Sequence, residues 1–252
     1  MTAVLVIAGS DSSGGAGIAR DVQTLAHFGV AALCALTAVT AQSDAQLTAV
    51  HLVPPDMVRA QIEAAFATRQ AGAIKIGMLG RRATVLAVAA SLATREPLPL
   101  VLDPVLASSS GGELLDAAGQ AALCETLLPR TTLLTPNIPE AAALLGTPRA
   151  RTEDELLRQA EALLALGPRA VLLKGGHGEG AVAVDLLLIR AEGLQRLSAP
   201  RCDATRRGTG CALSSAIAAG LAAGAALPEA CARAKRYVTA LLQQPDRHLE
   251  PT

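Results

Sequence analysis

The stretch RRGTGCALSSA at residues 206–216 combines residue types that can bind a phosphate and react beside it. Gly208 and Gly210 permit backbone conformations that turn several N–H groups toward one point, which is an anion-binding arrangement. Apolar residues recur at helical spacing from position 212 onward, so Cys211 is expected in the first turn of a helix. A helix N-terminus lowers the pKa of a thiol, so Cys211 could take a proton from a hydroxyl that attacks the phosphate. The alternative is a glycine-rich turn followed by a small buried cysteine.

Lysine and asparagine are nearly absent, which makes those that remain candidates for specific chemistry. Against nineteen Arg, the chain has three Lys and one Asn, which are Lys75, Lys174, Lys235 and Asn137. Lys174 stands beside two glycines in KGGH, where its ammonium group could reach a phosphate close to the backbone. The alternative reading of KGGH is a surface turn.

The stretch TPNIPE at residues 135–140 places Asn137 three residues before Glu140. A carboxylate at a strand end can bind Mg²⁺ directly or through waters, because Mg²⁺ prefers oxygen ligands and keeps several waters. The alternative is an ordinary helix start, with Pro139 in the first turn and Glu140 favoured there by the helix dipole. The sequence alone leaves both readings open.

The glycine-rich stretch AGSDSSGGAG at residues 8–17 follows an apolar run and opens a helical pattern. It fits neither the dinucleotide fingerprint nor the P-loop, and a flexible strand-to-helix turn is the alternative to a binding loop. Asp21 and Gln42 are candidates to face the same crevice. A heterocycle with ring nitrogens and an amino group would need one such acceptor and one mixed donor and acceptor.

Strand and helix patterns alternate along the chain, which predicts βαβ units and a mainly parallel sheet within one domain, residues 1–252. The expected strands cover residues 4–8, 30–42, 47–53, 73–79, 98–103, 131–137, 169–174, 181–190 and 193–200. The expected helices cover residues 18–29, 54–67, 82–94, 113–127, 139–145, 152–166, 210–223 and 228–243. Ligands of such sheets sit beyond the carboxyl ends of the strands, where Asp103, Asn137 and Lys174 fall.

Composition argues against several classes of function. The formal net charge is zero and aromatic residues make up 1% of the chain, so neither a basic face nor stacking platforms for nucleic acid are expected. Apolar runs are interrupted before they could span a bilayer, and the N-terminal stretch reads as a first strand, not a signal peptide. The five cysteines form no CxxC pair, which favours a reducing cytoplasm.

Eight ordered motifs resemble the hydroxymethylpyrimidine/phosphomethylpyrimidine kinases of thiamine biosynthesis, a family of the ribokinase-like superfamily. The motifs are AGSDSSGGAGIARD, TAVTAQ, IKIGML, VLDPV, LLPRTTLLTPNIPEA, LLKGGH, GTGCALSSAIAAGLA and AKRYV. The resemblance implies a ribokinase-like three-layer α/β/α sandwich, with a mostly parallel central sheet, a small β lid and a homodimeric assembly. It also implies phosphorylation of the pyrimidine hydroxymethyl group and then of the monophosphate, with ATP and Mg²⁺.

The resemblance assigns roles to individual residues by their place in these motifs. Cys211 would be the catalytic base, and Gly208, Thr209 and Gly210 would bind the transferring phosphate. The residues implied for the pyrimidine pocket are Gly9, Asp21, Gln42 and Met78. Those implied for ATP are Lys174, Asn137 and Lys235, and those implied for Mg²⁺ are Asp103 and Glu140, with Asn137 helping to organise the waters.

The chain departs from the motifs of the family at three places. Arg206-Arg207 stands where Thr-His usually precedes GTGC, Ser43-Asp44 stands where Asn-Thr usually follows TAQ, and the usual glycine-rich C-terminal tail is replaced by QQPDRHLEPT. A pyridoxal or pyridoxine kinase of the same superfamily is therefore the alternative. A catalytically silent ligand-binding relative would be expected to lack Cys211, Glu140 or the GTG glycines, and all of these are present.

Overall fold

The computed structural model describes residues 2–108, 112–175, 181–202 and 206–244. Its nine strands form one sheet in the order β3-β2-β1-β4-β5-β6-β7-β8-β9. The strands are β1 (Ala3–Asp11), β2 (Ala31–Gln42), β3 (Leu47–Leu52), β4 (Ala73–Ile76), β5 (Leu100–Leu102), β6 (Leu133–Leu134), β7 (Ala170–Leu173), β8 (Val182–Ile189) and β9 (Gly193–Pro200). The six central strands, which are β2, β1, β4, β5, β6 and β7 in sheet order, pair in parallel. At the two edges, β3 pairs antiparallel with β2, and β8 pairs antiparallel with β7 and β9. The mainly parallel sheet expected from the sequence is therefore confirmed.

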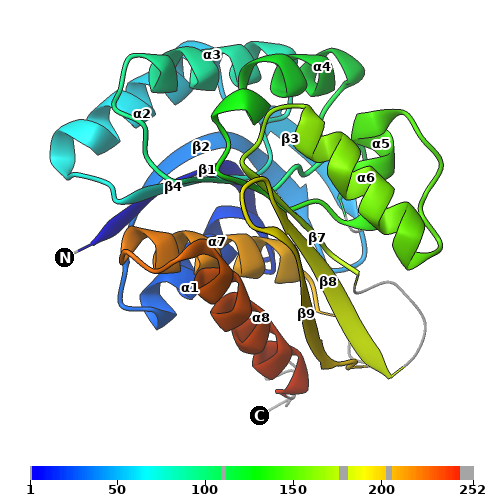
Figure 1. Ribbon diagram of the computed structural model, residues 1–252. Helices are drawn as coiled ribbons and strands as arrows, with labels where there is room; N and C mark the ends of the chain where they lie inside the picture. The colour runs from blue at the N-terminus through cyan, green and yellow to red at the C-terminus, as the bar shows by residue number, and fades with distance from the viewer. Residues whose placement is uncertain (1, 109–111, 176–180, 203–205, 245–252) are drawn as a thin grey trace.

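Helices cover both faces of the sheet and make three layers (Figure 1). One face carries α2 (Pro55–Thr68), α3 (Arg82–Ala93), α4 (Ala117–Thr126), α5 (Ile138–Leu145) and α6 (Glu153–Ala165). The other carries α1 (Gly17–His27), α7 (Thr209–Ala222) and α8 (Leu227–Gln243). A short 3₁₀ helix at Leu128–Arg130 leads into β6. The expected α/β/α sandwich is confirmed, with most element boundaries close to the expected ones.

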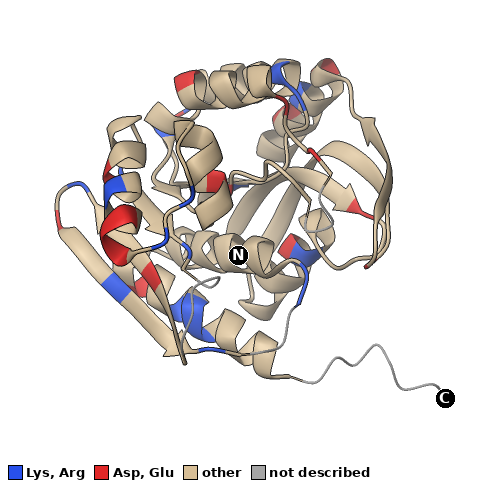
Figure 2. Cartoon of the chain, turned by 90° about the vertical axis from the view of Figure 1, so that its right-hand side faces the viewer, with Lys and Arg blue, Asp and Glu red and all other residues tan. Residues whose placement is uncertain are grey.

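The central strands are mostly apolar because both of their faces are buried. In β4, Ile74 and Ile76 pack with the core under α2 and α3, while Ala73 packs with the core under α7 and α8. Lys75 shares the side of Ala73 and is a charged residue in an otherwise apolar strand. Charged residues of both signs otherwise lie mainly on helices and loops, and the strands are mostly tan in Figure 2.

The antiparallel β2–β3 pair ends in a turn at residues 43–46, which we call the hairpin turn. Ser43 N–H donates to Gln46 O at 2.9 Å, and the Ser43 hydroxyl accepts from Ala45 N at 3.3 Å and from Gln46 N at 3.2 Å. This turn lies close to the carboxyl end of β1, because Ser12 directly after β1 bonds to the backbone of Gln42 directly before the turn. Among the described residues, none of the helices is long and apolar enough to cross a membrane.

Candidate active site

A cavity of about 1080 Å³ opens at the carboxyl ends of the parallel strands. It is the position at which α/β sheets of this kind bind ligands. With one exception, the predicted site residues line this cavity. They are Gly9, Gln42, Met78, Asp103, Asn137, Glu140, Lys174, Gly208, Thr209, Gly210, Cys211 and Lys235. Eight segments that are separated in the sequence therefore meet at one site.

The GTGC turn begins α7 and depends on its glycines. Gly208 is the N-cap residue and has φ +73°. A Cβ atom there would lie 2.2 Å from the carbonyl oxygen of Gly15, so only glycine allows the two glycine-rich segments to pack together. A Cβ atom on Gly210 would lie 3.3 Å from Lys174 Nζ and 3.5 Å from Asp103 Oδ2. The first turn of the helix, with Cys211 in it as expected, thus faces the charged strand ends.

Three charged side chains meet at the ends of β5, β6 and β7. Lys174 Nζ lies 3.0 Å from Asp103 Oδ1 and 3.8 Å from Glu140 Oε2. The pKa of Glu140 is raised to about 7. Burial is the main cause and the charge of Asp103 adds to it, while Lys174 acts in the opposite direction. Burial by itself lowers the pKa of Lys174, but the attraction of both carboxylates outweighs burial and keeps the lysine charged.

Asn137 and Glu140 form a capping box at the start of α5. The Asn137 side chain accepts from Glu140 N at 2.8 Å, and the Glu140 carboxylate accepts from Asn137 N at 2.7 Å. The helix-start reading of TPNIPE is therefore confirmed. It does not exclude a binding role, because both residues also line the cavity.

The depressed pKa expected for Cys211 is wrong for the ligand-free protein. The pKa of this thiol is raised to about 11. Burial is the main cause and the charges of Asp21 and Asp103 add to it, while the charge of Lys75 acts in the opposite direction. Loss of hydration therefore outweighs the charge of the lysine and the backbone hydrogen bond of Gly17, which both lower the pKa. The free cysteine carries its proton at neutral pH.

Asp21 is the one predicted pocket residue that is not among the residues lining the cavity. Its side chain is fully buried between α1, β4 and α7, outside the residues that line the cavity. Lys75 Nζ donates to both carboxylate oxygens at 2.8 and 2.9 Å, and Ser215 Oγ donates to Oδ1 at 2.8 Å. Asp21 therefore neutralises Lys75, which does reach the cavity wall.

Gly9, Gln42 and Met78 line the cavity from β1, from the end of β2 and from the segment after β4. A Cβ atom on Gly9 would lie 2.8 Å from Met78 Sδ, so glycine leaves room for the methionine. Gln42 ends β2, and its backbone is held by Ser12, whose hydroxyl donates to Gln42 O and accepts from Gln42 N at 2.8 Å each. The amide side chain of Gln42 is half-buried and faces the cavity.

Lys235 reaches the cavity from α8 and pairs with a residue that the sequence reasoning missed. Its Nζ lies 2.7 Å from Asp185 Oδ2, and Asp185 Oδ1 accepts from Gly175 N at 3.0 Å. The available signal was a single acidic residue within the apolar run VAVDLLLI. Arg207 and Asp11, which also line the cavity, were missed as well, because their partners lie far away in the sequence.

The part of the chain that the structure describes contains no cluster of three or more His, Cys, Asp or Glu side chains able to hold a metal. Asp103 and Glu140 form a two-carboxylate arrangement instead. Mg²⁺ in kinases is typically held by one or two carboxylates together with substrate phosphates and waters, so this pair fits the ion when phosphates are present.

Comparison with known proteins gives consistent similarities over nearly the whole chain. The family model described as phosphomethylpyrimidine kinase matches residues 11–250. A hydroxymethylpyrimidine/phosphomethylpyrimidine kinase from Rhizobium meliloti is 46% identical over 249 residues, which cover 98% of this chain and 93% of the relative. The crystal structure of a phosphomethylpyrimidine kinase from Clostridium difficile superposes with a TM-score of 0.84 at 37% identity, covering 96% of this chain and all of the other. A Bacillus subtilis pyridoxal kinase in complex with ADP superposes with a TM-score of 0.87 at 33% identity, covering 95% and 91% of the two chains.

Proposed function

The chain belongs to the phosphomethylpyrimidine kinase family, and from this we propose that it is an ATP-dependent kinase of thiamine biosynthesis. Its substrates are 4-amino-5-hydroxymethyl-2-methylpyrimidine and the corresponding monophosphate. The observation that carries the proposal is the meeting of the GTGC turn, Lys174 and Asp103 at one end of the cavity. Turnover of ATP with the pyrimidine, its monophosphate and the B6 vitamers, measured side by side, tests it.

Positioning and neutralisation of charge account for most of the catalysis of phosphoryl transfer. The first turn of α7 lies beside Lys174 at Gly210, and there its backbone N–H groups would bind oxygens of the transferring phosphoryl group. Cys211 in the same turn accepts the proton of the attacking hydroxymethyl group. Because the free thiol has a raised pKa, Cys211 can accept this proton only in the small fraction of molecules in which it is a thiolate.

The charged strand ends would bind the nucleotide. Lys174 contacts the phosphates of ATP, and Asn137 and Lys235 lie along the same wall of the cavity. Asp103 and Glu140 hold Mg²⁺, directly or through waters, and the ion would neutralise charge on the phosphate oxygens. Asp103 also fixes the direction of Lys174 through the 3.0 Å ion pair.

A B6 vitamer is the second candidate substrate, because the fold matches pyridoxal kinases as well. A Staphylococcus aureus pyridoxal kinase in complex with pyridoxal superposes with a TM-score of 0.89 at 27% identity. The greater identity with pyrimidine kinases favours the pyrimidine. Faster turnover of pyridoxal than of the pyrimidine would reverse the order of the two proposals.

Two further properties belong to the proposal. We place the enzyme in the reducing cytoplasm, which is consistent with its five free cysteines. We also expect a homodimer, and analytical ultracentrifugation of the purified chain measures the assembly directly.

Replacement of Gln42 by alanine should raise the KM for the pyrimidine by roughly ten- to a hundredfold and leave the KM for ATP nearly unchanged. The amide pairs with a ring edge, and leaving a buried polar partner unpaired costs about 1–3 kcal/mol. Gln46→Ala is the matched control, because Gln46 is exposed on the same hairpin turn and does not line the cavity. Equal changes in the two KM values would rule out this role of Gln42.

Replacement of Glu140 by glutamine should raise the Mg²⁺ concentration needed for half-maximal activity by about tenfold. This is the lower end of the loss in metal affinity that is typical when a residue supporting a metal ion is replaced. In the unmutated protein, the pKa of about 7 means that protons compete with Mg²⁺, so the Mg²⁺ requirement should rise as the pH falls through 7. The glutamine variant should lose this pH dependence.

Glu155→Gln controls for the loss of a capping box. Glu155 occupies the same third helical position in the capping box of α6, but it does not line the cavity. Both variants should lose similar stability, whereas only Glu140→Gln should change the Mg²⁺ titration. Identical Mg²⁺ curves for the two variants would show that Glu140 acts only as a cap.

A further inference from the structure

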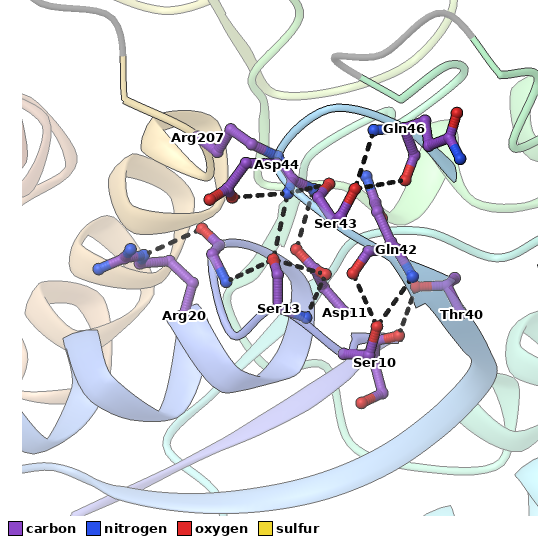
Figure 3. Close-up of polar contacts among 12 residues, drawn as sticks. Ser10, Asp11, Ser13, Arg20, Thr40, Gln42, Ser43, Asp44, Gln46 and Arg207 are labelled. Atoms are coloured by element: carbon purple, nitrogen blue, oxygen red, sulfur yellow. Dashed lines mark hydrogen bonds and ion pairs between the residues drawn. The ribbon is translucent and has the colours of Figure 1, made fainter. Parts of the chain in front are cut away.

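The guanidinium group of Arg207 joins three segments of the chain at the rim of the cavity (Figure 3). Its Nη2 donates to Asp11 Oδ2 at 3.0 Å at the end of β1. Its Nη1 donates to Ser13 Oγ at 3.1 Å in the glycine-rich segment, to Ser43 O at 2.8 Å and to Asp44 Oδ1 at 3.2 Å in the hairpin turn. Arg207 itself directly precedes the GTGC turn.

The contact with Asp11 is the firm half of this arrangement. Asp11 is 4% exposed in its side chain, and its second oxygen accepts from both the backbone N and the hydroxyl of Ser13 at 2.9 Å. A charge-assisted hydrogen bond that is shielded from water and supported in this way holds a side chain in one place. The guanidinium group is thus fixed relative to β1.

The contact with the hairpin turn is the exposed half. The side chain of Asp44 is 89% exposed, so water and salt weaken its attraction to Arg207. The bond to Ser43 O engages the backbone of the turn directly. This half can therefore open while the bond to Asp11 stays closed.

The two segments that Arg207 connects are each next to a part of the proposed site. Ser43 follows Gln42, whose backbone is held to the glycine-rich segment by Ser12. On the other side, Gly208 follows Arg207 and packs against Gly15 O. A displacement of the hairpin turn would therefore move Gln42 away from the segment that positions the GTGC amides.

We propose that Arg207 is a positioning residue that couples the pyrimidine side of the cavity to the phosphate side by holding the hairpin turn against the GTGC turn. The proposal rests on the proposed function. A pyrimidine bound at Gln42 favours the closed hairpin turn, and the closed turn favours the arrangement of backbone amides that binds the nucleotide. Because such coupling is reciprocal, AMP-PCP should in turn tighten binding of the pyrimidine.

Calorimetric titration of AMP-PCP, with and without 4-amino-5-hydroxymethyl-2-methylpyrimidine, measures this coupling without turnover. Asp44→Asn should reduce the enhancement of AMP-PCP affinity by the pyrimidine by about two- to fivefold, the range for an exposed ion pair, with an unchanged Tm. About 1 M salt should have the same effect on the unmutated protein and little further effect on the variant. Asp56→Asn is the matched control, since Asp56 is 90% exposed in a pair with Arg59 on α2.

Arg207→Lys tests the central residue while keeping a positive charge beside Asp11. A lysine cannot bridge both halves, so it should reduce the coupling at least as much as Asp44→Asn does. The double variant should then be no worse than Arg207→Lys alone. Strictly additive effects, or an unchanged coupling in Asp44→Asn, would overturn the proposal.

Hydrogen exchange on the ligand-free protein separates this proposal from the proposed function. Asp44→Asn should speed amide exchange in the hairpin turn and at residues 206–210, and Asp56→Asn should not. If the unmutated chain fails to bind the pyrimidine, the proposed function is wrong, and faster exchange at both segments would still support the link through Arg207. Exchange that is unchanged at both segments would overturn the link whatever the substrate is.

Discussion

Replacement of Cys211 by alanine is expected to lower kcat by about 10²–10⁴, the range for loss of a general base. The thiol is in the first turn of α7, beside the backbone amides proposed to bind the phosphate. Those amides remain in the variant, so the affinity for AMP-PCP should change little. Steady-state kinetics with the pyrimidine and ATP, together with titration of AMP-PCP, measure the two effects separately.

Two further substitutions at this position separate a base from a packing residue. Cys211→Asp should recover part of the activity because a carboxylate can accept the same proton, whereas Cys211→Ser should resemble alanine because its hydroxyl is a far weaker base. Cys231→Ala is the control, since this buried cysteine in α8 packs in the core and should cost stability alone. If Cys211 only packs, alanine and serine leave kcat unchanged and aspartate destabilises the fold.

The raised pKa of Cys211 gives these variants a pH signature. With a pKa of about 11, the thiol is almost wholly protonated near neutral pH, and the thiolate fraction grows about tenfold for each pH unit up to that value. If the thiolate is the base, kcat of the unmutated protein should rise from pH 7 to about pH 9. The rise should disappear in Cys211→Asp, whose carboxylate is already ionised there. A flat profile for the unmutated protein would contradict the thiolate of Cys211 as the base.

Local patterns in the sequence were sufficient to place most of the site. Residues that are neighbours in the sequence suffice to show the apolar run of β1, the helical spacing after Cys211 and the polar residues at strand ends. The positions predicted for Asp103 and Lys174 at these strand ends were right. The effect of the helix terminus on Cys211 could be anticipated, but the amount of protein packed around the thiol could not. Burial is a property of the whole fold, and here it decides the direction of the pKa shift.

Long-range pairs mark the limit of such reasoning. In α1, the buried stripe runs through Asp21 and Leu25, while Val22 is exposed, so a charged residue occupies an inward position. That pattern indicates a buried partner, but the partner, Lys75, is 54 residues away. In the same way, the contacts of Arg207 with Ser43 and Asp44 span 163 residues or more, so no local pattern in the sequence indicates them.

Replacement of Lys75 by methionine is expected to lower the free energy of unfolding by about 3–5 kcal/mol, because it leaves the carboxylate of Asp21 buried without its partner. Both side chains have 0% exposure, and Lys75 donates to both oxygens of Asp21. Burial alone lowers the pKa of Lys75, but the attraction of Asp21, together with that of Asp103, outweighs it, so the lysine is charged in the fold. Urea unfolding at pH 7 measures the loss.

The second substitution Asp21→Asn, combined with Lys75→Met, isolates the cause. Asparagine keeps an acceptor for Ser215 Oγ but has no charge to leave unpaired, so the double variant should regain most of the lost stability. Arg59→Met is the exposed control, since its pair with Asp56 has exposures of 58% and 90% and should contribute about 0–1 kcal/mol. Equal losses in Lys75→Met and the double variant would mean that the packing of the lysine chain, not its charge, supports the floor of the cavity. Lys75 also lowers the pKa of Cys211 and so offsets part of the effect of burial on the thiol. The thiol of the folded double variant should therefore have a different pKa from that of the unmutated protein, which links the stability of this buried pair to the chemistry of Cys211.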